Sequence, residues 1–314
     1  MRINKSLVFE FPMRNGSLII LLLCLIGSSN CLSAQTILQF ETVLKREPLS
    51  SQQGAAVYGK HLFLFSDKGI CDIYDLEKSD CLGQMSYEKL DIKHCDTAAF
   101  GTYKIDEMDE FPVVYLSGSQ MNKHDESGLI WVYRIIHTNN KWEMKLFQII
   151  RTPSVKDIGA FPDALLSNSD GCIWLMGWKT QLGKTSKDGS GAYLNFSKFK
   201  TPQLEDGELD ESGIRNVTLS ISDAITSFVV KDAHAVQQGI CFWNKKVYVP
   251  YGFAGFGYQG IDIVSLDEGR IVRNINLMGT GIREPEAIFF YKGKMYIADG
   301  ATSIKRIVNY QENE

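Results

Sequence analysis

The stretch "EPEAIFFYKGKMYIADG" (residues 284–300) joins a polar opening to two short apolar segments that flank a tight turn. It recurs as "VQQGICFWNKKVYVP" (236–250) and "SQQGAAVYGKHLFLF" (51–65), and two looser copies begin at "HCDTAAFG" and "FPDALLSNSDG". In the three close copies a polar residue precedes a small one, and an aromatic residue (Tyr291, Trp243 or Tyr58) precedes the turn. Repeats of this length indicate an architecture built from one recurring unit.

Each copy is followed by further segments in which apolar residues alternate with polar ones, as is typical of half-buried strands. The last unit has only three such segments, whereas "TILQFETVL" (36–44) is a strand without a unit of its own. If this N-terminal strand completes the last unit, five four-stranded sheets close into a ring without a free edge. The sequence therefore predicts an all-β fold, a five-bladed β-propeller over residues 35–314. A sixth blade within residues 200–232 is the alternative.

Residues 1–34 have the features of a secretory signal peptide. Arg14 precedes an apolar run at residues 18–26, and small residues extend to Ala34. The run is too short to span a bilayer as a helix, so we expect cleavage and no transmembrane helix in the mature chain. Lipidation at Cys31 is an alternative, although "SSNC" lacks an apolar residue three places earlier. The prediction is an exported monomer, periplasmic or extracellular.

The charge of the chain argues against nucleic acid as a partner. Lys and Arg number 33 against 37 Asp and Glu, and no basic stripe occurs. Five of the seven cysteines lie beyond residue 34. Cys71 and Cys81 could form a disulfide in an oxidising compartment, but each also fits a buried apolar position.

The polar column of the repeat predicts a ring near one mouth of the central channel, because the first strand of each blade lines that channel. His94 and Glu284 each lie two residues before a ring residue and so share its strand face. Converging oxygen atoms suit a polar ligand or Ca²⁺, and no other cofactor is predicted. The five ring residues are Gln53, Asp96, Asp163, Gln238 and Glu286.

Two other interpretations of the ring remain open. Asp96 and Asp163, which come from neighbouring blades, could act as the carboxyl pair of a glycosidase with Glu286 as a third member, and the distance between the carboxyl groups would decide the mechanism. Alternatively, the ring only binds ordered water and has a structural role. Whether the protein is an enzyme is left open.

A glycine-rich stretch, "YGFAGFGYQG" (251–260), carries four aromatic residues. Tyr251 and Tyr258 are predicted to contact a sugar ring or a peptide because each has a polar tip, whereas Phe253 and Phe256 are expected to pack between blades. His234, just before this unit, is predicted to be solvated.

The segments "QGICFWNKKVYVPYGF", "HCDTAAFG" with "EFPVVYLSGS", and "EPEAIFFYKGKMYIADG" resemble a group of exported, uncharacterised bacterial β-propeller proteins of the TolB-like kind. The resemblance covers most of the mature chain and implies export and the propeller, but it implies no activity and no catalytic residue. The first functional hypothesis is binding of a glycan or other small polar ligand at the channel mouth. A carbohydrate hydrolase or lyase and a protein-interaction scaffold are the alternatives.

Overall fold

The computed structural model describes residues 38–45, 52–87, 95–121, 127–179, 186–300 and 303–310. The chain divides into two compact units, residues 1–37 and 38–314, and every described residue belongs to the second. The predicted signal peptide and Cys31 lie outside the described residues. Within the described ranges no helix has the length and apolar character needed to cross a membrane.

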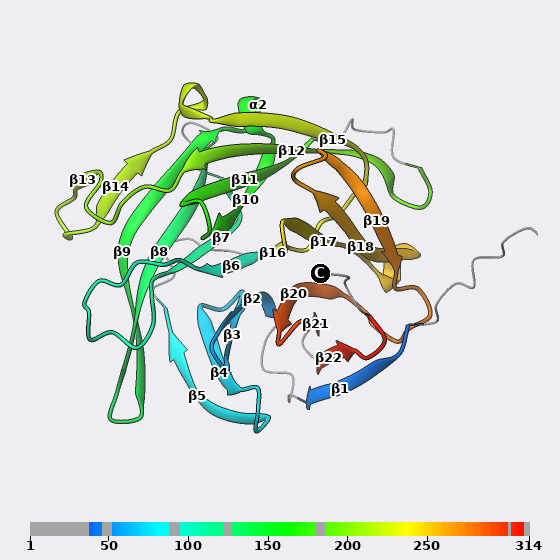
Figure 1. The fold of residues 1–314 in the computed structure, drawn as a ribbon, viewed down its shortest axis with the longest axis horizontal. Coiled ribbons are helices and arrows are strands. Elements are labelled where there is room, and N and C mark those ends of the chain that lie inside the picture. Colours follow the sequence, from blue (N-terminus) through cyan, green and yellow to red (C-terminus); the bar gives the residue numbers. More distant parts are fainter. Residues whose placement is uncertain are drawn as a thin grey trace, which may run out of the picture. The chain divides into compact units, whose positions relative to one another are not determined.

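Five antiparallel sheets follow one another around a centre (Figure 1). Blade 1 contains β2 (Gln52–Tyr58), β3 (His61–Ser66), β4 (Ile70–Asp75) and β5 (Asp80–Ser86). Blade 2 contains β6 (Thr97–Phe100), β7 (Val114–Met121), β8 (Ser127–Thr138) and β9 (Lys141–Ser154). Blade 3 contains β10 (Ala160–Ser167), β11 (Cys172–Lys179), β12 (Ser190–Lys200) and β15 (Thr226–His234). Blade 4 contains β16 (Cys241–Trp243), β17 (Lys246–Phe253), β18 (Tyr258–Ser265) and β19 (Arg270–Asn276). Blade 5 contains β20 (Pro285–Tyr291), β21 (Lys294–Asp299), β22 (Ser303–Ile307) and β1 (Phe40–Lys45).

The closure predicted from the sequence is confirmed. β1 pairs antiparallel with β22, in a register that places Phe40 opposite Ile307, so the N-terminal strand supplies the outer strand of blade 5. The inner strands β2, β6, β10, β16 and β20 gather at the centre in Figure 1. The five-bladed propeller that the resemblance implied is therefore present, whereas the TolB-like relationship and export stay predictions.

The alternative of a sixth blade is wrong. Residues 200–232 instead contain a short hairpin, β13 (Glu208–Leu209) and β14 (Arg215–Thr218), followed by the start of β15. β14 pairs in parallel with β9 and enlarges blade 2 to six strands, and β15 returns to complete blade 3. The buried Gln148 side chain fixes this crossing, because its Nε2 donates to the carbonyl oxygens of Gln203 (2.9 Å) and Asp206 (3.2 Å). Short helical turns occur at α2 (Val155–Ile158), η1 (Ile221–Asp223) and η2 (Ala254–Phe256).

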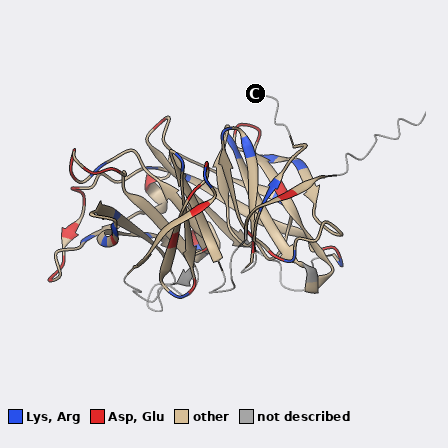
Figure 2. Cartoon of the chain, turned by 90° about the horizontal axis from the view of Figure 1, so that it is seen from below, with Lys and Arg blue, Asp and Glu red and all other residues tan. Residues whose placement is uncertain are grey.

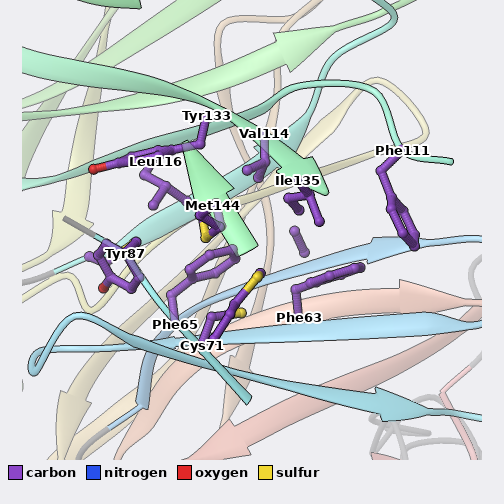
Figure 3. Close-up of a cluster of buried hydrophobic side chains, with 14 of the residues drawn as sticks. Phe63, Phe65, Cys71, Tyr87, Phe111, Val114, Leu116, Tyr133, Ile135 and Met144 are labelled. Atoms are coloured by element: carbon purple, nitrogen blue, oxygen red, sulfur yellow. The ribbon is translucent and has the colours of Figure 1, made fainter. Parts of the chain in front are cut away.

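Apolar side chains fill the space between neighbouring blades. Figure 3 shows one such cluster, where Phe63 and Phe65 of β3 face Leu116 of β7 and Met144 of β9. Such clusters arise because successive residues of a strand point to opposite faces, and each face of a blade is covered by the next blade.

Cys71 belongs to the same cluster, whereas Cys81 is exposed. The register of β4 and β5 places Cys71 opposite Met85 and Cys81 opposite Tyr74, and the two cysteines are not bridged. The expected buried apolar role is confirmed for Cys71 and is wrong for Cys81, and the disulfide is not formed.

Candidate functional site

Two glycines, Gly54 of β2 and Gly239 just before β16, show that the channel is closed at the level of the polar column. A Cβ atom on Gly239 would lie 2.4 Å from the carbonyl oxygen of Asp96 and 3.0 Å from that of Glu286. A Cβ atom on Gly54 would lie 2.6 Å from the carbonyl oxygen of Cys95. The backbones of different blades are in contact here, so only glycine fits. We call this level the closed end of the channel.

Most polar side chains at the closed end are buried and bonded within the protein. Gln53 and Glu286 are 6% and 2% exposed, and Gln53 Nε2 donates to Glu286 Oε1 at 3.3 Å. Gln238 is half-buried, and its Nε2 donates to Glu284 Oε1 at 3.2 Å and to the carbonyl oxygen of Gly252 at 3.4 Å. The structure therefore brings these four predicted residues together as two amide–carboxylate pairs.

The two aspartates of the column also lie near one another. Burial raises the pKa of Asp163 well above its usual value, and the charge of Asp96 raises it further, while the hydroxyls of Thr97 and Ser117 act in the opposite direction. Ser117 Oγ donates to Asp163 Oδ1 at 3.5 Å and accepts from the backbone N–H of Ala164 at 2.9 Å. The environment of Asp163 favours its protonated form.

The predicted metal and ligand roles of the column stay predictions. Among the described residues, no group of three or more His, Cys, Asp or Glu side chains is arranged to hold a metal ion. His94 lies outside the described residues.

Beyond the closed end the inner strands diverge around a cavity of about 560 Å³. All five inner strands contribute to its wall with residues that follow the polar column: Ala55–Tyr58, Thr97–Phe100, Leu165 and Leu166, Ile240–Trp243, and Ile288–Phe290. The β6–β7 connection adds Gly101, Thr102, Lys104 and Pro112, and Asn168 follows β10. We call this cavity the channel cavity.

Exposed aromatic rings line the channel cavity. Trp243 is 37% exposed and stacks on Phe290, with ring centroids 5.0 Å apart and planes 6° apart. Tyr58 is 38% exposed and packs against Phe100 at 5.4 Å. Both belong to the aromatic column of the repeat, for which no functional role was predicted from the sequence.

The position of these rings follows from the turns after them. Asn244 and Lys245, which follow Trp243, have φ values of 48° and 59°, as in the two-residue turns that suit a twisted hairpin. The register pairs Trp243 with Lys246 and Tyr58 with His61, so each ring ends its inner strand. The third member, Tyr291, is directed to blade 1 instead, where its hydroxyl donates to Glu77 Oε1 at 3.3 Å.

The wall of the channel cavity also offers backbone polar groups. Each inner strand ends its sheet and is hydrogen-bonded to one neighbouring strand in the described part of the chain. The opposite edge of such a strand directs N–H and C=O groups away from its sheet, here toward the axis. Aromatic faces and backbone donors and acceptors thus occur in one cavity.

The predicted aromatic loop is arranged differently from the expectation. Tyr251 is buried, its hydroxyl accepts from Asn274 Nδ2 at 2.9 Å, and its ring is stacked on His234 at 4.0 Å. Tyr258 is half-buried and packs close to Gly189, with burial raising its pKa. The ligand-binding role of the two tyrosines stays a prediction.

The expectation for His234 is wrong. Its side chain is 17% exposed, and its Nδ1 lies 3.0 Å from both carboxylate oxygens of buried Asp262, which also accept from the backbone N–H of His234 and from Asn274. This cluster joins blade 3 to blade 4. Sequence could not reveal it, because β15 and β18 meet only when the blades pack.

No protein-family model matches this sequence, and no curated protein does either. Among solved structures, glutaminyl cyclase from Myxococcus xanthus is 12% identical, over 85% of this chain and 97% of that one, with a TM-score of 0.44. The soluble aldose sugar dehydrogenase from Escherichia coli is 8% identical, over 86% and 99%, with a TM-score of 0.45. The computationally designed protein Ika8 is 11% identical, over 85% and 99%, with a TM-score of 0.37. No activity and no functional residue is transferred from these structures.

Proposed function

We propose that the protein is an exported β-propeller of the TolB-like kind that binds a glycan in the channel cavity. The observation that carries this proposal is the pair of exposed rings, Trp243 and Tyr58, in a cavity enclosed by five strand edges. Export rests on the signal-like sequence of residues 1–34.

The shape and chemistry of the channel cavity support a sugar. Its volume of about 560 Å³ falls within the range of small-molecule sites, about 300–1,000 Å³. A sugar ring has apolar C–H faces that pack on aromatic rings and hydroxyls that bond to backbone N–H and C=O groups. Trp243 is held flat by Phe290, so stacking a ligand on it would cost little side-chain entropy.

The test is a titration with a panel of monosaccharides and disaccharides, followed by tryptophan fluorescence and by calorimetry. We expect saturable binding, and Trp243→Ala should weaken it about tenfold, because one aromatic stacking contact is worth on the order of 1.4 kcal/mol. Leu209→Ala is the control, since Leu209 is an exposed apolar side chain on β13, away from the inner strands. Absence of saturable binding, or equal affinities of wild type and Trp243→Ala, would contradict the proposal.

A carbohydrate hydrolase is the second candidate, and the raised pKa of Asp163 favours it. A carboxyl whose pKa is raised by burial can serve as a general acid, and Asp96, half-buried beside it, could serve as its partner. Against this, the closed end has no space beside Gly239 for a substrate.

Hydrolysis is tested with oligosaccharides built from the sugars of the same panel. Each oligosaccharide is incubated with wild type, Asp96→Asn and Asp163→Asn. Release of reducing ends by wild type and its loss in both variants would establish the enzyme. Binding of sugars without release would leave glycan binding as the function.

A further inference from the structure

The charge of the channel cavity differs from that of the molecule as a whole. Lys/Arg and Asp/Glu are both found along the loops and strand ends (Figure 2), and the chain carries a formal charge of −4. Of the residues known to line the channel cavity, Lys104 is the one with a charged side chain, and none is acidic. It lies on the β6–β7 connection, three residues beyond Gly101.

The acidic residues of the same connection are turned away from the channel cavity, toward β8. Asp109 Oδ1 accepts from Arg134 Nη2 at 2.6 Å, and its side chain is 7% exposed. Glu110 Oε2 lies 2.9 Å from His137 Nδ1. Both basic partners belong to β8. Asp109 and Glu110 are therefore directed toward β8, whereas Lys104 of the same connection lines the channel cavity.

Three remaining groups do not supply a negative charge to the cavity wall. Asp106 and Glu107 are exposed on the same connection and are not part of the lining, and Asp106 Oδ2 lies 3.9 Å from Arg134 Nη2. Cys241 does line the cavity, but burial raises the pKa of its thiol to about 12, so it is neutral at physiological pH.

We propose that the ligand of the channel cavity is an anionic sugar, one that bears a carboxylate or a sulfate, and that Lys104 binds the anionic group while Trp243 stacks on the ring. This inference rests on the proposed function, which it narrows from glycans to acidic glycans. The ammonium group of a lysine is a point charge, whereas a guanidinium group forms two parallel hydrogen bonds to a carboxylate. Lys104 therefore favours negative charge in general and does not distinguish a carboxylate from a sulfate.

The test compares matched pairs of probes: glucuronate with glucose, galacturonate with galactose, and galactose 6-sulfate with galactose. Affinities are measured for wild type, Lys104→Gln and Lys104→Arg, at low and at high salt. Lys141→Gln is the control, because it removes the same charge from the exposed first residue of β9.

We expect wild type to prefer the anionic member of a pair by roughly threefold, the size typical of a solvent-exposed ion pair, and salt should reduce the preference. Lys104→Gln should remove the preference while neutral sugars bind as before, and Lys104→Arg and Lys141→Gln should keep it. Equal binding of charged and neutral sugars by wild type, or an unchanged preference in Lys104→Gln, would overturn the inference and leave glycan binding intact. If no sugar binds at all, the proposed function fails and the inference fails with it.

Discussion

The two ends of the central channel are built from the same five strands, yet they differ in almost every physical property. At the closed end, backbones of different blades touch at Gly54 and Gly239, and the side chains of Gln53, Asp163 and Glu286 are buried. A few residues further along each strand, the wall opens into a cavity with exposed aromatic rings.

The polarity of a repeat column therefore does not by itself locate a ligand site. The polar column is conspicuous in the sequence, but its side chains bond to one another within the protein, as the Gln53–Glu286 and Gln238–Glu284 hydrogen bonds show. The aromatic column is apolar, but at Trp243 and Tyr58 its faces are open. The polar and aromatic columns differ in solvent accessibility, which is set only once the five blades pack together.

The largest effect should come from filling the closed end. Gly239→Ala places a methyl group 2.4 Å from the carbonyl oxygen of Asp96, and we expect a loss of about 3 kcal/mol in the free energy of unfolding, because two rigid backbones must separate. Val57→Ile is the comparison at the channel cavity, where Val57 is half-buried in the wall and beside a core cluster, and it should cost less than about 0.5 kcal/mol. Urea denaturation measures both, and equal losses would remove the distinction between the two ends.

A smaller effect should follow from breaking an amide–carboxylate pair. Gln53→Ala removes the donor to buried Glu286 and should cost about 2 kcal/mol, since a hydrogen bond to a buried acidic group is lost. Thr102→Ala removes a polar group from the exposed wall of the channel cavity and should be nearly neutral. Thermal midpoints measure both variants. If Gln53→Ala lowers the midpoint no more than Thr102→Ala does, the Gln53–Glu286 hydrogen bond does not stabilise the closed end.

Sequence reasoning predicted the architecture because the repeat encodes it locally. Each blade is a run of neighbouring antiparallel strands, and the incomplete last unit together with the spare N-terminal strand indicated the closure between β1 and β22. The parallel pairing of β14 with β9 could not be predicted, because it joins residues more than sixty positions apart through a strand of four residues, three half-buried and one exposed.

For the site, the sequence predicted which polar residues lie on the inner strands or just before them, but it could not assign their exposure. The column of Gln53, Asp163 and Glu286 was expected at a channel mouth, and it lies where strand backbones meet. Trp243 and Tyr58 were visible as a column before each turn, yet nothing in the sequence distinguishes a ring that faces a cavity from one that, like Tyr291, faces a neighbouring blade.

The smallest effect should be a change in pH dependence. Because the pKa of Asp163 is raised in the folded state, its contribution to stability is full below the ordinary pKa of a carboxyl group and is lost as the pH rises through the raised value. Asp163→Asn keeps the shape of the protonated acid and removes this titration, so the thermal midpoint of the variant should rise relative to wild type as the pH increases. Calorimetric scans across acid to neutral pH measure the difference, and a constant difference would show that Asp163 titrates normally.

The central claim, that ligands bind at the aromatic end and not at the polar ring, is tested most directly by one calorimetric comparison. A sugar that binds wild type is titrated into Trp243→Ala and Asp163→Asn, after circular dichroism has shown that both variants are folded. We predict an affinity about tenfold lower for Trp243→Ala and unchanged for Asp163→Asn. Loss of binding in Asp163→Asn with unchanged affinity in Trp243→Ala would contradict the account and return the ligand to the polar ring.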